Sequence, residues 1–118
     1  MWDDLRATWN HEHGYTNVWR KGQLSGSERI RKTGVGEGAL TAAHLNQKPL
    51  EFMELQIAST TNPGDVVWEP FGGLGSAAVA SVLLNRSVFY SEVNLNYYSI
   101  ARKRCEDALG SVSLKEVG

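Results

Sequence analysis

The chain has 118 residues, of which 42% are hydrophobic and 21% are charged, with a formal net charge of −1. This length allows one small domain and excludes two. The near-neutral charge excludes a global electrostatic attraction to nucleic acid. No apolar run in the sequence reaches the roughly 20 residues that a membrane span requires.

The cysteine and histidine residues limit the cellular compartment and the metal chemistry that the sequence allows. The single cysteine, Cys105, excludes a disulfide within the chain and fits a reducing environment. The N-terminus lacks the basic-then-apolar pattern of a signal peptide, so we expect a soluble cytoplasmic protein. His11, His13 and His44 form no recognised metal spacing with Cys105, and no metal site is expected.

The sequence of residues 1–43 predicts an irregular N-terminal arm. Three tryptophans near its start follow no helical or alternating period, and residues 20–43 are rich in glycine, serine and charge. Five basic residues between positions 20 and 32 accompany a single acid, so any contact with phosphates is expected here; the alternative, which composition alone favours, is a solvated loop. The basic residues are Arg20, Lys21, Arg29, Arg31 and Lys32.

Residues 44–110 predict an ordered α/β region. A helix is expected from Pro49, with Leu50, Met53 and Ile57 on its apolar face. A turn at 62–65 leads to a strand at 66–68, whose continuous apolar run is typical of a strand buried on both faces. A glycine-rich turn at 69–76, a helix over 77–85, a strand at 87–90 and a helix over 95–109 follow, and residues 111–118 are expected to form a tail.

This order predicts one right-handed β-α-β unit of a nucleotide-binding α/β sheet. The glycine turn follows a strand and opens a helix, and the acid Glu92 ends the next strand, where a carboxylate can accept hydrogen bonds from ribose hydroxyls. The turn matches neither GxGxxG nor GxxxxGK[ST], which disfavours a dinucleotide and a P-loop. Glu69 and Pro70 place negative charge beside the turn, which suits a cationic amino acid or a sulfonium; the alternative for Glu69 is a solvated strand end.

Three motifs in residues 44–104 resemble the cofactor half of DNA N6-adenine and N4-cytosine methyltransferases. The family turn D-P-F-x-G-x-G-T is similar to Glu69–Ser76, and the family segment H-x-x-Q-K-P-x-x-L is similar to His44–Phe52. The family's acid followed by Asn and Tyr, with an Ala-x-x-Arg helix, is similar to residues 92–104. The resemblance implies a partial Rossmann-like, three-layer α/β/α methyltransferase fold with an incomplete sheet, and S-adenosylmethionine as cofactor.

The resemblance also implies which residues bind that cofactor. Residues 71–75 would line its methionine and ribose, Glu92 would hold the ribose hydroxyls, and residues 47–49 would border the methionine end. Glu69 stands where Asp is commoner and Ser76 where Thr is commoner, and both keep the functional group. The implied cofactor residues are Gln47, Lys48, Pro49, Glu69, Pro70, Phe71, Gly72, Gly73, Gly75, Ser76, Glu92 and Asn94.

The family's catalytic motif, [DNS]-P-P-[YFW], is absent from the chain, because the three prolines are not adjacent. That motif holds the flipped base and its amine, so no catalytic residue is assigned. We expect the chain to bind cofactor for site-specific DNA methylation together with a catalytic half. The alternatives are a non-catalytic partner or regulatory subunit of a methyltransferase, or a methyltransferase acting on RNA or protein. One edge of strand 66–68 would pair with the catalytic half. Without that half the unpaired edge is expected to favour association with another chain.

Overall fold

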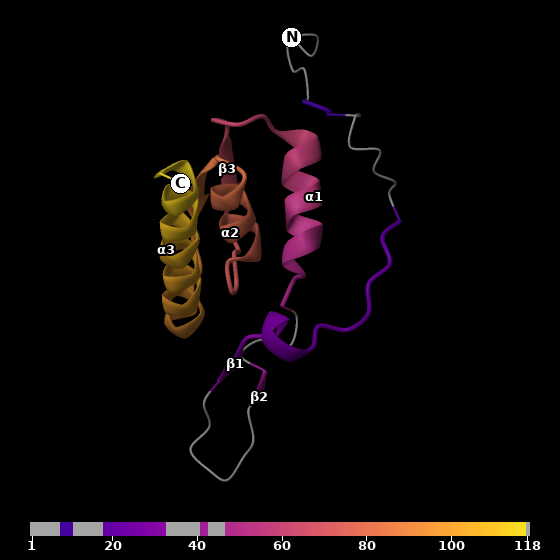
Figure 1. Cartoon of the computed structure of the whole chain (residues 1–118). Helices are drawn as coiled ribbons and strands as arrows, with labels where there is room; N and C mark the ends of the chain where they lie inside the picture. The colour runs from indigo at the N-terminus through magenta and orange to yellow at the C-terminus, as the bar shows by residue number, and fades with distance from the viewer. Residues whose placement is uncertain (1–7, 11–17, 33–40, 43–46, 118) are drawn as a thin grey trace.

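The computed structural model describes residues 8–10, 18–32, 41–42 and 47–117 (Figure 1). Trp2, His11, His13 and the first three residues of the segment 44–52 lie outside these ranges, as do the predictions made for them. Within the described residues, the chain forms a 3-10 helix η3 (Gly26–Glu28), strands β1 (Arg31–Lys32), β2 (Thr41–Ala42), β3 (Val66–Glu69) and β4 (Ser87–Tyr90), and helices α1 (Leu50–Thr60), α2 (Ser76–Leu83) and α3 (Leu95–Val117). None of these helices combines the length and the apolar character needed to cross a membrane.

The central unit is β3-α2-β4. The two strands pair in parallel, with Trp68 beside Phe89 and Glu69 beside Tyr90. Parallel strands need a crossover connection, and α2 supplies it. The sequence prediction of a β-α-β unit is confirmed, and so is the turn before it, where the Asn62 amide donates to the Asp65 carboxylate at 2.8 Å.

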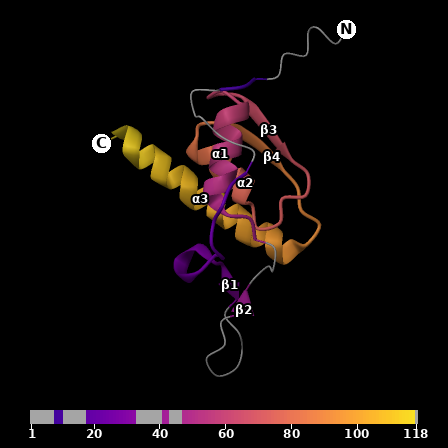
Figure 2. The same cartoon turned by 90° about the vertical axis from the view of Figure 1, so that its right-hand side faces the viewer.

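Helix α2 is the element on which the others pack. It contacts both strands, α1 and α3. Ala78, Ala80 and Ser81 on this helix have no exposed surface, because their small side chains let the neighbouring elements approach closely. Figures 1 and 2 show the strands on one side of α2, with α1 and α3 flanking the helix. The described residues therefore form two layers, one of helices and one of sheet, which are two of the three layers that the resemblance implies.

The two-layer arrangement corrects one prediction about β3. The sequence predicts a strand buried on both faces, yet Val66 is 58% exposed and Trp68 is 75% exposed. Successive strand residues point to opposite faces, and the described helices cover only the face that carries Val67 and Glu69. On β4, Phe89 is 69% exposed on the same uncovered side as Trp68.

Helix α3 is longer than predicted. The predicted helix ends at Leu109, with a tail over 111–118, whereas α3 continues to Val117. Gly110 lies inside the helix with nothing near its Cα on the side where a Cβ would stand. A helical glycine costs only about 1 kcal/mol relative to alanine, so it does not end a helix that is otherwise favoured. The Arg102–Glu106 and Lys103–Asp107 pairs, four residues apart, support the helix just before this glycine.

The described parts of the N-terminal arm are not irregular throughout. Strands β1 and β2 form a short antiparallel pair. Trp19 packs on Phe52 of α1 with ring centroids 5.5 Å apart. The Asn10 side-chain amide donates to the carbonyls of Ala58 and Thr61 at 2.8 Å each, at the C-terminal end of α1. The described residues around Asn10 and Trp19 therefore contact α1, and Figure 1 shows the indigo segment running alongside that helix.

Arg86 is buried between the ends of two helices. Its guanidinium donates to the Thr61 hydroxyl at 2.9 Å and to the Thr61 carbonyl at 2.7 Å, after α1, and to the Leu84 carbonyl, after α2. Helix C-termini leave carbonyls without helical partners and carry partial negative charge. Arg86 therefore fixes how the two helices end against each other.

Replacing Arg86 with methionine should lower the free energy of unfolding by about 2–4 kcal/mol, because it leaves buried carbonyls without a donor. Urea unfolding followed by circular dichroism measures this change. The matched control is Arg102→Met, which removes an exposed pair and should change stability by less than about 0.5 kcal/mol. Equal effects of the two substitutions would contradict the assigned role of Arg86.

Candidate cofactor-binding site

The glycine turn between β3 and α2 is held by the end of β4. The Gly72 amide donates to the Ser91 carbonyl at 3.0 Å, and the Ser91 hydroxyl donates to the Pro70 carbonyl at 2.8 Å. The Ser91 amide in turn donates to the Glu69 carbonyl at 3.0 Å. These bonds extend the strand pairing into the turn, so the turn rests on the carboxyl edge of the sheet.

Glu92 fastens the same turn from the next position. Its Oε2 accepts a hydrogen bond from the Gly73 amide and its Oε1 accepts one from the Asn94 amide, both at 2.8 Å. Asn94 then caps α3, because its side-chain oxygen accepts from the amides of Asn96 and Tyr97 at 3.0 and 3.2 Å. The Glu92 carboxylate therefore orders both the turn and the start of α3.

Tyr90 is a residue of the site that the sequence analysis did not single out. Its hydroxyl donates to the Gly73 carbonyl at 2.6 Å, and its ring lies directly against Gly72. Burial and the nearby Glu92 carboxylate raise the pKa of the Tyr90 phenol to about 12. The phenol therefore remains a hydrogen-bond donor at neutral pH. A tyrosine before an acid carries no sequence signal for this role, since only the folded strand end brings it under the turn.

Gly75 has a structural reason to be glycine. It adopts φ of 75° as the residue that begins α2, and a Cβ there would lie 2.7 Å from the Cβ of Ala101 in α3. The close approach that requires glycine at this position is therefore made by α3. Arg104, one turn further along α3, donates to the Leu74 carbonyl and to the Ser76 hydroxyl. The Ala-x-x-Arg motif thus packs on the turn through both of its named residues.

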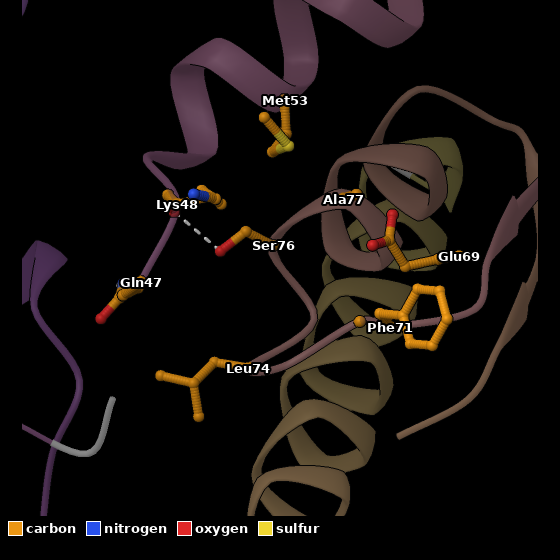
Figure 3. A pocket seen from close by; sticks show the side chains of 9 residues that line it. Gln47, Lys48, Met53, Glu69, Phe71, Leu74, Ser76 and Ala77 are labelled. Carbon is orange, nitrogen blue, oxygen red and sulfur yellow. Dashed lines mark hydrogen bonds between the residues drawn. The ribbon is translucent and has the colours of Figure 1, made fainter. Parts of the chain in front are cut away.

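A cavity of about 200 Å³ opens between the turn and the start of α1 (Figure 3). The Ser76 hydroxyl donates to the Lys48 carbonyl at 2.9 Å and joins its two walls. Burial raises the pKa of the Glu69 carboxyl, which faces this cavity. A cation bound there would offset that desolvation. The cavity is lined by Gln47, Lys48, Met53, Glu69, Phe71, Gly72, Leu74, Ser76 and Ala77.

A second hollow, of about 360 Å³, lies on the other side of Phe71. It is lined by Pro70, Phe71, Ser91, Glu92 and Val93. The Phe71 side chain is 89% exposed and borders both spaces. The structure therefore distributes the predicted cofactor residues over two adjoining hollows. Pro49, Gly73, Gly75 and Asn94 line neither of them.

Gln47 has a further task that its motif does not reveal. Its amide nitrogen donates to the Glu28 carbonyl at 2.7 Å, and its amide oxygen accepts from the Ile30 amide at 2.9 Å. Gln47 thereby fixes the N-terminal arm beside the cavity that it lines. The position of residues 28–30 next to the cavity follows from this pair of bonds.

The predicted phosphate-binding residues have different surroundings. Lys21 forms ion pairs with Glu28 at 2.9 Å and with Glu51 at 3.3 Å, and these bonds raise the pKa of its ammonium. Arg20 is exposed and Arg29 is half-buried. Arg31 and Lys32 form β1. Among the described residues no group of acidic, histidine or cysteine side chains could hold a metal ion.

The DNA methylase family model for N6 and N4 methyltransferases matches residues 2–103, and the chain belongs to this family. This membership agrees with the resemblance inferred from the sequence motifs.

Among its relatives are two Type II methyltransferases of Haemophilus influenzae. M.HinfI is 33% identical over 83% of this chain, and M.HindIII is 33% identical over 87%. The chain spans 26% and 30% of their lengths, respectively.

A solved structure shares the fold. The crystal structure of the M1.HpyAVI–SAM complex superposes with a TM-score of 0.52 and 30% identity, over 64% of this chain and 43% of that chain. The predicted fold class, a partial Rossmann-like α/β methyltransferase fold, is confirmed.

Replacing Gly75 with alanine should lower the free energy of unfolding by about 2–4 kcal/mol, from the left-handed backbone and the contact with Ala101. Gly110→Ala is the matched control: it fills open space in a helix and should raise stability by about 0.5–1 kcal/mol. Thermal unfolding of the two variants measures whether each substitution lowers or raises stability. A stable Gly75→Ala protein would show that α3 does not press on the turn.

Proposed function

We propose that this chain binds S-adenosylmethionine as the cofactor part of a DNA methyltransferase that methylates adenine N6 or cytosine N4. The observation that carries the proposal is the pair of hollows on either side of Phe71, one with Glu69 and the other with Glu92. Family membership supports the reaction class, and the M1.HpyAVI–SAM complex supports the identity of the cofactor.

The charges of the two hollows suit the parts of this cofactor. S-adenosylmethionine carries a sulfonium and an α-ammonium, and the desolvated Glu69 carboxylate would favour either cation. Lys48 lines the same cavity and would face the methionine carboxylate. On the other side of Phe71, Glu92 would accept hydrogen bonds from the ribose hydroxyls. Among the remaining predicted cofactor residues, Gly72 and Gly73 belong to the turn that the end of β4 holds, while Gln47 fixes the N-terminal arm.

Wild-type protein should bind S-adenosylmethionine in isothermal titration calorimetry, and Glu92→Ala should weaken that binding roughly 10- to 150-fold through loss of hydrogen bonds to a charged group. Circular dichroism of the variant checks that the fold survives loss of the bond to Gly73. Glu106→Ala, an exposed acid on α3, is the control and should bind as the wild type does. Unchanged affinity in a folded Glu92→Ala protein would refute the assignment.

The basic segment of the arm is our proposed DNA contact. Neutralising Arg20, Arg29, Arg31 and Lys32 should reduce a weak, sequence-independent binding that falls steeply with salt. Lys21→Gln should have a smaller effect, because the Lys21 ammonium is engaged by two carboxylates. Gel shifts at several salt concentrations measure this; Arg31→Gln with Lys32→Gln is compared with the charge-matched control, Arg102→Gln with Lys103→Gln on α3. An equal loss in the control would place the contact elsewhere.

We further infer that methyl transfer requires a second component that carries the P-P-aromatic motif. Without that motif the target amine is not positioned, and positioning supplies much of the rate enhancement of methyl transfer. The exposed side chains of Val66, Trp68 and Phe89 offer an apolar surface for that component. The alternative function, a non-catalytic partner of a complete methyltransferase, uses the same surface.

The chain alone should transfer no tritiated methyl group from S-adenosylmethionine to mixed DNA, and transfer should appear when a fragment with the missing motif is co-expressed. Size-exclusion chromatography should show a complex that Trp68→Lys weakens. Leu114→Lys, on an exposed position of α3, should leave the complex intact. A monodisperse monomer that methylates DNA unaided would refute the inference. A complex in which only the partner binds cofactor would favour the regulatory alternative.

A further inference from the structure

The space above Gly72 is occupied by the ring of Tyr90. A Cβ built on Gly72 would lie 1.9 Å from Cε2, 2.4 Å from Cδ2 and 2.9 Å from Cζ of that ring. Real Cβ atoms do not approach other heavy atoms below 3.0 Å. Gly72 occupies the x position of the turn pattern D-P-F-x-G-x-G-T, where that pattern itself does not require glycine. The requirement for glycine at this position comes from Tyr90.

The Tyr90 ring has little freedom to move away. Its hydroxyl is bound to the Gly73 carbonyl at 2.6 Å, and its ring packs near that of Tyr98 in α3, with centroids 6.0 Å apart. Its backbone pairs with Glu69 at the end of the parallel ladder. One side chain therefore supports two consecutive residues of the turn, Gly72 by contact and Gly73 by a hydrogen bond.

Tyr90 itself borders neither hollow, whereas Gly72 lines the cavity that holds Glu69. Any effect of Tyr90 on a ligand must therefore pass through the backbone of the turn. A side chain at residue 72 would be displaced by the ring, and the turn would move with it. The two residues are matched to each other.

We propose that Gly72 and Tyr90 form a matched pair in which Tyr90 is a positioning residue that sets the glycine turn for cofactor binding. This inference rests on the proposed function for its ligand. The pairing itself rests on the contact and the hydrogen bond alone.

A double-mutant cycle in the full chain tests the pair. Gly72→Ala, Tyr90→Ala and the double variant are compared with the wild type in urea unfolding and in calorimetry with S-adenosylmethionine. Gly72→Ala alone should weaken cofactor binding more than about tenfold, because the turn is displaced. In the Tyr90→Ala background the same substitution should change affinity less than about twofold. Equal effects of Gly72→Ala in both backgrounds would overturn the proposal.

Conservative variants separate positioning from stability. Tyr90→Phe keeps the ring and loses the bond to Gly73, and it should weaken binding about two- to tenfold. Tyr98→Phe is the hydroxyl control and should bind as the wild type does. If Tyr90→Phe binds cofactor with unchanged affinity, the hydroxyl does not position the turn and that part of the proposal falls.

The unfolding measurements need no cofactor, so they distinguish failure of the proposed function from failure of the Gly72–Tyr90 pair. Wild-type protein that fails to bind S-adenosylmethionine would refute the proposed function, while coupling between residues 72 and 90 in unfolding would still support the pair. Coupling in unfolding without coupling in affinity would overturn the positioning role. Absence of coupling in both measurements would overturn the pair altogether.

Discussion

The docking of the glycine turn on the end of β4 is the contact on which the site depends. Three consecutive residues make it: Tyr90 bonds the Gly73 carbonyl, Ser91 bonds Pro70 and Gly72, and Glu92 bonds the Gly73 amide. Without the bonds of Tyr90 and Glu92, the part-buried carbonyl and amide of Gly73 would lose their partners, which is unfavourable by up to about 1–3 kcal/mol for each group. The same bonds bring Glu92 to the turn, so the proposed ribose-binding acid and the stability of the turn depend on one set of interactions.

Close packing of α2 makes this docking possible. Small side chains on α2 let α1, α3 and both strands approach the helix, and Gly75 lets α3 pass directly over the start of that helix. Arg104 completes the contact by donating to the Leu74 carbonyl. Because the turn is enclosed by α3 on one side and β4 on another, its conformation is specified by neighbours that are distant in sequence.

Several features of the site could be predicted because their cause is local. The strand–turn–helix order and the acid after the second strand follow from hydrophobic runs and glycine placement. The structure brings Glu69, Phe71 and Ser76 to one cavity. Other features could not be predicted. Lys21 belongs to a basic segment, yet Glu51, thirty positions away, engages it. Gln47 belongs to the family segment, yet it also holds the backbone of the arm.

The sequence by itself determined the β-α-β order, the glycine turn, the acid that follows it and the absence of adjacent prolines. These depend on the residue types and spacing along a short stretch of chain. Only the tertiary structure decided which face of β3 is covered, how far α3 extends and why Gly72 and Gly75 must be glycine. Each of those depends on the distance between atoms of separate elements, such as the Tyr90 ring and the Ala101 methyl group, and no spacing along the chain encodes that distance.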